Sequence, residues 1–337
     1  MSFPSYLNNR RQLLALGWLV FLLVVATLAD WLPLPYAPGA SDLTHLAEPP
    51  FAGLADPQHW LGTDPQGHDL LAGLIFGART TLVVSVPAAL LAIGVGVLLG
   101  SAAGFWGDTN LRIPLGYLLG ISCLLLVGLF SGFHLWPAPT LAWPLTLLGF
   151  AVTILFVTKY GWFLRRVTIA LPVDRLVMSV IALLESIPRL ILVLVVASVQ
   201  ESSVFTLLIV LSLTYWTGPA RLIRAEVMRI RVLPYIEAVR ASGLTNLSIL
   251  AYHVLPNASR SVRTAFPLSI AALIGLETTL SFLGIGLPTE TASWGRLMAT
   301  ARLDPTAWWL IAEPGLLLLC TMLALRQLAL STDHPSK

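Results

Sequence analysis

The sequence predicts an all-α, polytopic membrane protein, and its composition and hydropathy carry this prediction. Hydrophobic residues make up 56% of the 337 residues, charged residues only 11%, and the mean hydropathy is +0.82. A soluble domain carries roughly 25% charged residues, so a soluble fold of this size would lack the polar surface that it needs. Apolar runs long enough to cross a bilayer also recur along the chain.

The positive charges predict how the spans are oriented. Arg10 and Arg11 precede the first apolar run, which ends near Leu32, whereas residues 33–78 contain acidic residues but no Lys or Arg. Because Lys and Arg concentrate on the cytoplasmic side of a membrane, we expect both termini in the cytoplasm and an external loop at 33–79. Within this loop, Asp64-Pro65-Gln66-Gly67 has the residues of a type I turn.

We expect about eight membrane-spanning helices in one transmembrane domain, 1–337. The expected spans lie near residues 12–32, 80–106, 113–133, 141–163, 176–199, 204–223, 264–287 and 308–328. Gly96, Gly100 and Gly104 recur every four residues in the second span. Such a stripe of small residues lets another helix pack closely, and a role as a moving seam is the alternative.

A polar interruption, Pro234 to Pro256, lies in the most basic stretch of the chain, residues 224–263. Helix-forming residues follow Pro234, and Gly243 stands where a helix ends in a left-handed residue. Thr245 can cap a second short helix. The pattern predicts a helix, a glycine turn and a helix between two spans on the cytoplasmic side, where a compact element can serve a partner.

The same stretch carries a family resemblance. Glu237-Ala238-Val239, Gly243 six positions after the glutamate, and Leu255-Pro256 resemble the EAA motif of the membrane subunits of bacterial binding-protein-dependent ABC importers. Residues 59–82 and 277–295 resemble two further blocks of the dipeptide, oligopeptide and nickel branch, with His68 replacing the usual Arg. Residues 108–171 have no counterpart in the six-span family core, so we expect an inserted extra helix pair there.

The resemblance implies an importer-type ABC permease fold in the bacterial inner membrane. It implies a permease subunit of an ATP-driven importer for peptides or a related small solute. The expected partners are the lipid bilayer, a second homologous permease, two cytoplasmic ATP-binding subunits that carry ATP and Mg, and an extracytoplasmic substrate-binding protein. The substrate stays open between peptides, nickel and other solutes. An ATP-independent carrier or channel is the alternative, but the sequence lacks the inverted repeats that a carrier of this kind would have.

The resemblance also assigns the contact with the ATPase to residues of the EAA-like stretch. These are Tyr235, Ile236, Glu237, Ala238, Val239, Gly243, Leu255 and Pro256, with Tyr235, Ile236 and Val239 expected on the apolar face of a coupling helix. No Walker A glycine loop is present in the sequence. We therefore expect the chain to be a transport subunit rather than an enzyme, to bind no cofactor itself, and to bind no nucleic acid.

Three charged residues inside predicted spans, Glu185, Arg189 and Glu277, are candidates for a polar translocation path. A lone charge at the bilayer centre costs roughly 2.5–3.5 kcal/mol on insertion scales, and the spacing of Glu185 and Arg189 allows them to pair on one helix face. Pro188 between them predicts a kink. A structural role is the alternative for all three: a buried pair, or snorkelling of Arg189, for the first two, and helix-packing hydrogen bonds for Glu277. The six histidines and two cysteines show no metal-ligand spacing, so we expect no metal site.

Overall fold

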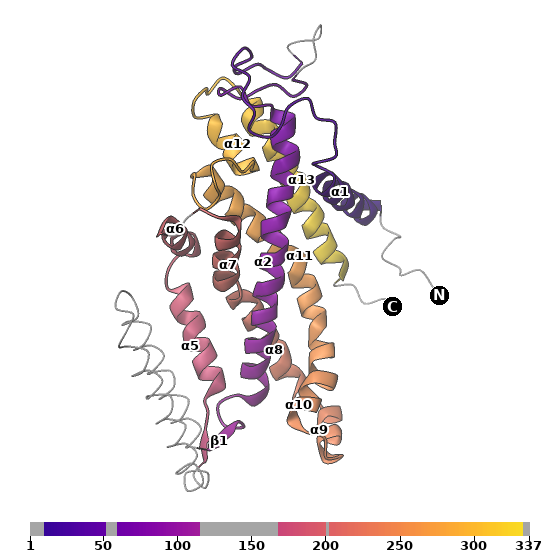
Figure 1. Ribbon diagram of the computed structural model, residues 1–337. Coiled ribbons are helices and arrows are strands. Elements are labelled where there is room, and N and C mark those ends of the chain that lie inside the picture. The colour runs from indigo at the N-terminus through magenta and orange to yellow at the C-terminus, as the bar shows by residue number, and fades with distance from the viewer. Residues whose placement is uncertain (1–9, 52–58, 115–167, 200–201, 333–337) are drawn as a thin grey trace, which may run out of the picture. The chain divides into compact units, whose positions relative to one another are not determined.

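The computed structural model describes residues 10–51, 59–114, 168–199 and 202–332, and it confirms the predicted helical class (Figure 1). The described elements, in chain order, are α1 (Arg10–Thr27), α2 (Leu70–Trp106), β1 (Arg112–Pro114), β2 (Thr168–Ala170), α5 (Val173–Glu185), α6 (Arg189–Val199), α7 (Val204–Tyr215), α8 (Thr217–Ile230), α9 (Pro234–Ala241), α10 (Asn246–Ser248), the π-helix η2 (Ile249–Val254), α11 (Leu255–Phe282), α12 (Trp294–Thr300) and α13 (Trp309–Thr332). The two strands are only three residues long each.

Five of the described helical stretches are long and apolar enough to cross a membrane, and the bent pair α5–α6 raises the number to six. They are α1, α2, α7 with α8, the stretch from α10 to α11, and α13. These stretches coincide with six of the spans expected from the sequence. The two further spans predicted at 113–133 and 141–163 fall almost wholly outside the described residues.

The chain divides into two compact units, one formed by residues 1–101 with 180–337 and the other by residues 102–179. In the second unit, β1 pairs antiparallel with β2, with Arg112 opposite Ala170. The carboxylate of Asp108 accepts a hydrogen bond from the backbone N–H of Arg175 at 2.9 Å. These contacts bring residues 108–114 next to residues 168–175. The helix pair expected within 108–171 lies outside the described residues.

Two clusters of buried side chains hold the first unit together. One joins α2, α6, α7, α11 and α13 and includes Leu207 and Leu273. The other joins α1, α2, α12 and α13 and includes Trp294 and Trp309. Since lipid tails are as apolar as leucine, close packing rather than transfer out of water stabilises such contacts inside a membrane.

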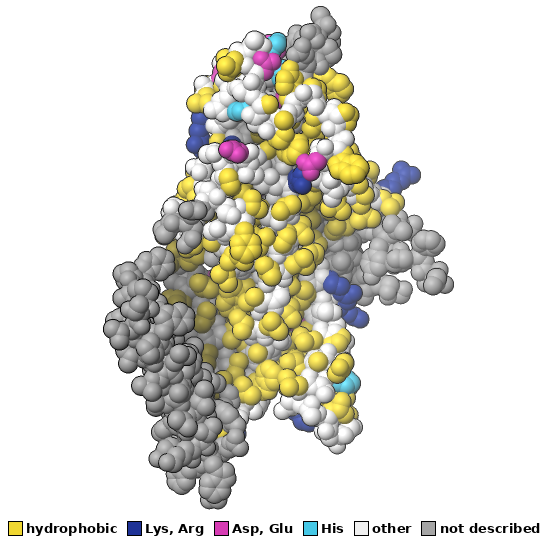
Figure 2. Space-filling model, viewed as in Figure 1, with side chains coloured by type: hydrophobic (Ala, Val, Ile, Leu, Met, Phe, Trp, Pro, Cys, Tyr) yellow, Lys and Arg dark blue, Asp and Glu magenta, His cyan; other side chains and the backbone are white. Residues whose placement is uncertain are grey.

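Hydrophobic side chains cover the middle of the face shown in Figure 2, and the acidic side chains visible there lie toward the end that carries residues 28–69 and α12. Many large apolar side chains of the first unit remain exposed on its helices. Examples are Leu14, Phe21, Leu98, Phe205, Leu213 and Leu316. Lipid or another membrane helix suits such a surface, whereas water does not.

Helix α2 begins earlier than the predicted start at Thr80. The Asp69 carboxylate accepts a hydrogen bond from the backbone N–H of Ala72 at 2.8 Å and thereby caps the helix. Arg79, which the sequence-based estimate placed outside the span, pairs with Asp30 at 2.7 Å. With 37 residues and a rise of 1.5 Å per residue, α2 is about 55 Å long, so it extends well beyond the ~30 Å hydrocarbon layer.

The second short helix continues directly into the next membrane span. Helices α10, η2 and α11 form one continuous stretch from Asn246 to Phe282. Pro256 lies in the first turn of α11, where a missing backbone N–H is tolerated. The backbone N–H of Leu255 bonds to the carbonyl of Leu250, five residues back, so a π-helical turn carries the chain into α11 without a break.

Candidate functional site

The stretch of residues 234–256, called here the 234–256 element, folds as the predicted helix, glycine turn and helix. Helix α9 ends at Ala241, and Gly243 adopts a φ of +83°, a left-handed conformation that glycine reaches without steric cost. The Thr245 hydroxyl then accepts a hydrogen bond from the backbone N–H of Ser248 at 3.3 Å and caps α10. Local sequence alone accounts for this shape.

The 234–256 element is firmly joined to the start of α11. Ile236 is fully buried, and α9 packs against η2. The side-chain amide of Asn257 donates to the Tyr235 hydroxyl at 3.1 Å and to the His253 carbonyl oxygen at 2.7 Å. A force on α9 is therefore transmitted to α11 through side-chain contacts as well as through the chain.

Of the three side chains expected on the apolar face of this element, only Tyr235 is exposed, at 40%. Ile236 points inward rather than toward a partner, and Val239 is half-buried. The most exposed apolar side chains are instead Leu247 at 67% and Tyr252 at 77%. A helical period of 3.6 residues does not locate them, because the π-helical turn after α10 changes the period.

The other predicted members of the contact surface lie on α9, in its turn and at the start of α11. Glu237, Ala238 and Gly243 are exposed on α9 and its turn. Leu255 is half-buried and Pro256 is exposed at the start of α11. The predicted set thus contains exposed acidic and small residues, and sequence reasoning missed the two most exposed apolar side chains of the same element, Leu247 and Tyr252.

The predicted pairing of Glu185 with Arg189 is wrong. Helix α5 ends at Glu185 and α6 begins at Arg189, and the two axes are bent by 77° at this break. Pro188 lacks the backbone N–H that would continue the helix, so the two charges do not share a helix face. The kink predicted at Pro188 is thus a full break between two helices.

Each of these two charges finds its partner on the neighbouring helices instead. Glu185 forms an ion pair with Arg221 at 2.9 Å. The guanidinium of Arg189 lies over the Tyr215 ring at 4.7 Å and donates to the Thr217 hydroxyl at 3.4 Å. A cavity of about 220 Å³ opens beside Glu185, Arg189 and Thr217. These contacts hold the α5–α6 break against α8, beside a hollow that has both apolar and charged side chains in its wall.

Glu277 is completely buried at a junction of α2, α11 and the loop before α12. Its carboxylate accepts hydrogen bonds from the hydroxyls of Ser281 at 2.8 Å and Ser293 at 2.9 Å, with longer contacts of 3.4 Å to Thr81 and Thr278. These hydroxyl donors satisfy a carboxyl group that apolar surroundings would otherwise make costly. This geometry fits the alternative role considered for Glu277, which is to form hydrogen bonds between packed helices.

Further contacts join residues 59–82, one block of the family resemblance, to the second block, 277–295, and to the start of α13. The Trp294 indole N–H donates to the Leu74 carbonyl oxygen at 2.9 Å, and the Trp309 indole donates to the Thr63 carbonyl oxygen at 3.1 Å. Arg296 donates to backbone carbonyls of the loop 287–291, among them Pro288 at 2.6 Å. Desolvation at this half-buried site lowers the pKa of Arg296. The two blocks therefore form one structural region at the end of the unit opposite the 234–256 element (Figure 1).

Two of the three stripe glycines lie against α8 and the residue before it. A Cβ atom added to Gly96 would lie 2.8 Å from the Pro219 Cβ, and one added to Gly100 would lie 2.3 Å from the Ala220 carbonyl oxygen. Real Cβ atoms essentially never approach other atoms so closely. Glycine at these two positions therefore permits backbone contact between the helices. Gly104 falls in the second unit.

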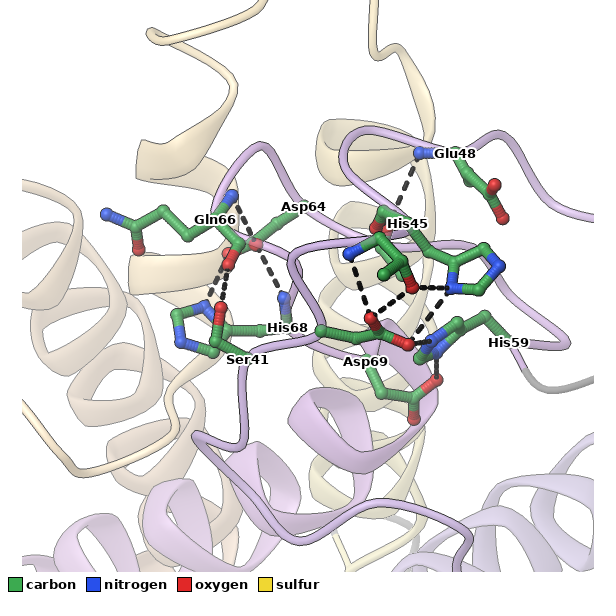
Figure 3. A network of polar contacts seen from close by, with 11 residues as sticks. Ser41, His45, Glu48, His59, Asp64, Gln66, His68 and Asp69 are labelled. Atoms are coloured by element: carbon green, nitrogen blue, oxygen red, sulfur yellow. Dashed lines mark hydrogen bonds and ion pairs between the residues drawn. The ribbon is translucent and has the colours of Figure 1, made fainter.

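The Asp64 turn organises the loop that precedes α2 (Figure 3). The Asp64 backbone carbonyl accepts a hydrogen bond from the Gly67 N–H at 3.0 Å, which closes the predicted turn. Its carboxylate accepts from the backbone N–H groups of Gln66 and His68, both at 2.9 Å, and contacts His68 Nδ1 at 3.0 Å. The contact with this carboxylate raises the pKa of His68. A cleft of about 530 Å³ lies beside this turn, with Arg296 and Glu290 on its other wall.

Comparison with known proteins places the chain among transport proteins. Residues 161–330 match the family described as "Binding-protein-dependent transport system inner membrane component". The dipeptide transport system permease protein DppC of Bacillus subtilis is 26% identical over 321 residues, which cover 94% of this chain and 78% of the relative. The oligopeptide permease OppC of the same organism is 24% identical, covering 87% of this chain and 74% of the relative. The di/tripeptide permease DppC of Pseudomonas aeruginosa is 26% identical, covering 95% and 86%.

The family match covers half of the chain and includes the α5–α6 break, the 234–256 element and Glu277. Together with the five or six apolar spans, it makes the protein a multi-pass transport subunit rather than an enzyme. The chain belongs to the family of inner membrane permease components of binding-protein-dependent transport systems.

Proposed function

We propose that this chain is a permease subunit of an ATP-driven peptide importer and that the 234–256 element docks on a cytoplasmic ATP-binding subunit. The observation that carries the proposal is the shape of this element. It is a short helix, α9, followed by a glycine turn and a second, capped helical segment that exposes Leu247 and Tyr252, at one end of a membrane bundle. Exposed apolar side chains beside a charged residue such as Glu237 suit a protein partner better than water.

The attachment of the element explains how it would transmit motion. Tyr235, His253 and Asn257 bind α9 to the start of α11, and α11 runs without a break into the membrane region up to Phe282. When ATP closes two ATP-binding subunits, a displacement of α9 becomes a tilt of α11 as a rigid body. In this scheme the partner subunits hold ATP and Mg and carry out hydrolysis.

The opposite end of the first unit suits an extracytoplasmic substrate-binding protein. The loop before α2 and the loop around α12 meet there, and they border the cleft of about 530 Å³. Residues 33–78 contain no Lys or Arg, which supports an external position for this end and a cytoplasmic position for both termini.

A second, homologous permease subunit would complete the pathway. The exposed apolar faces of α6 and α7, with Ile191 and Phe205 among their side chains, are available to lipid or to such a subunit. In this assembly Glu185 and Arg189, at the hollow beside the α5–α6 break, are the charged groups proposed to line the path. The names of the relatives support peptides as the substrate class.

Charge reversal on α9 tests the docking proposal. Glu237→Lys should lower the retention of the ATP-binding subunits during purification of the assembled transporter and lower peptide uptake, while the chain still inserts. Asp304→Lys reverses a charge at the opposite end of the unit and should retain the ATP-binding subunits. Normal retention and uptake with Glu237→Lys, and with a second variant, Gly243→Pro, would refute the proposed docking site.

A further inference from the structure

Three potential metal ligands lie close together in the loop before α2. Their spacing in the sequence does not match any usual metal-binding motif. One ligand atom each from Asp42, His45 and His59 lies within 4.8 Å of the others. Figure 3 shows the rings of His45 and His59 next to each other, with Asp69 beside His59. Two features of the loop bring these groups together. One is the turn at Asp64, and the other is a hydrogen bond from the Asp42 backbone N–H to the Gly67 carbonyl oxygen at 2.9 Å.

The orientation of His59 indicates a ligand at its outer nitrogen. Its side chain is only 2% exposed, and its Nδ1 lies 2.9 Å from a carboxylate oxygen of Asp69. Because that carboxylate accepts the hydrogen bond, Nδ1 carries the proton and Nε2 has a free lone pair in the neutral ring. Among the described residues, Nε2 has no hydrogen-bond partner although it is buried.

The atom that faces this lone pair is itself an electron-pair donor. His59 Nε2 lies 3.7 Å from Oδ2 of Asp42, beyond hydrogen-bonding distance. The other carboxylate oxygen of Asp42 accepts from the Thr44 backbone N–H at 2.9 Å and from its hydroxyl at 2.5 Å. Oδ2 therefore points toward the two imidazoles, with His45 Nδ1 at 2.9 Å. Two lone pairs that face each other in a buried position are stabilised by a cation between them.

The ligand types and spacing select the class of cation. Two imidazole nitrogens and one carboxylate oxygen suit Zn²⁺ or a similar first-row divalent ion, whereas Ca²⁺ and Mg²⁺ prefer oxygen ligands. In a tetrahedral zinc site with bonds of 2.0–2.1 Å, two ligand atoms are about 3.3 Å apart. The distances of 2.9 and 3.7 Å from Asp42 Oδ2 to the two rings lie on either side of this value.

The contact between His59 and Asp69 is of a kind that is common beside metal-binding histidines. A histidine that ligates a metal usually donates its other ring N–H to a carboxylate, which fixes the tautomer and makes the ligating nitrogen more basic. The side chain of His45 is 36% exposed and that of Asp42 is 19% exposed. The site is therefore open on one side, where water or a partner's side chain can fill the fourth position.

We propose that Asp42, His45 and His59 bind a divalent transition-metal ion of the Zn²⁺ class and that Asp69 orients His59 as a positioning residue. The ion would fasten the segment 41–45 to the residues that lead into α2. This site is independent of the proposed contact with ATP-binding subunits, which lies at the other end of the first unit.

The test is a zinc titration of the assembled transporter, purified without a polyhistidine tag and stripped with a chelator. A chromophoric zinc indicator competes for the ion, and Zn²⁺ alone is added. The wild type should bind at least one ion per permease chain. His59→Gln and His45→Gln should each abolish binding of this zinc ion or lower its affinity at least tenfold. His68 lies in the same loop but faces Asp64, so His68→Gln should bind zinc like the wild type.

Asp69→Asn tests the positioning residue, because asparagine keeps one acceptor oxygen for the Ala72 N–H that caps α2 but places a donating NH2 group opposite His59 Nδ1 and carries no charge. It should lower the zinc affinity by about 10- to 100-fold. Unchanged affinity in this variant would overturn the role of Asp69. Zinc binding that is the same in the wild type, His59→Gln and His45→Gln would overturn the site, as would a wild type that binds no zinc. His45 is partly exposed, so its variant keeps the test valid even if His59→Gln fails to fold.

Discussion

Replacing Gly100 by alanine should separate α2 from α8. The added Cβ would lie 2.3 Å from the Ala220 carbonyl oxygen, whereas ordinary contact begins at 3.4 Å. The two backbones must therefore move apart by about 1 Å, and overpacking of this kind costs about 1–3 kcal/mol. Alanine also favours a helix over glycine by roughly 0.5–1 kcal/mol, so the net loss is smaller than the clash alone.

Gly94→Ala is the matched control on the same helix. A Cβ at Gly94 meets nothing within 4 Å, so this variant keeps the gain in helix propensity and lacks the clash. The difference between the two variants isolates the clash, at about 1–3 kcal/mol. Thermal unfolding of the purified transporter measures it, with a shift of about 2–4 °C for each kcal/mol. Equal unfolding temperatures for Gly100→Ala and Gly94→Ala would refute the reasoning.

Three further variants test other contacts. Ser293→Ala removes one donor to Glu277 and the cap of α12, and we expect a loss of about 1–3 kcal/mol and faster proteolysis of the loop 288–307; unchanged values would contradict the assigned role. Gly243→Ala places an L-residue at a φ of +83° in open space and should cost about 1–2 kcal/mol in thermal stability, with Gly243→Asn less harmful. A double-mutant cycle of Arg221→Ala and Glu185→Gln should give a coupling of at most about 1 kcal/mol, because the Arg221 side chain is 51% exposed; a much larger coupling would show that the pair is better shielded from solvent than this.

Local chemistry explains which parts of the fold the sequence predicts well. The turn at Asp64 and the glycine at 243 depend on a few neighbouring residues, so turn and cap rules locate them. The apolar spans follow from composition over about 20 residues. Helix ends are less predictable: α2 begins ten residues before Thr80, where Asp69 caps it, and Arg79 inside the helix pairs with Asp30, far away in sequence.

The polar contacts inside the bundle depend on tertiary structure and were predicted less well. Glu185 and Arg189 have the spacing of a helical pair, but the break at Pro188 turns each toward α8 and the end of α7. The gathering of Asp42, His45 and His59 depends on a loop that folds back on itself, and no spacing rule contains that information. Leu247 and Tyr252 were missed because the π-helical turn shifts the helical period.

Site-specific cross-linking tests the central claim most directly. A single cysteine in place of Leu247 is introduced in a background that lacks Cys123 and Cys320, and a second variant carries a cysteine in place of Leu303. Both side chains are about equally exposed, at 67% and 64%, at opposite ends of the first unit. A cross-link from position 247 to an ATP-binding subunit, with none from 303, is the predicted result. A cross-link from 303 and none from 247 would contradict the account.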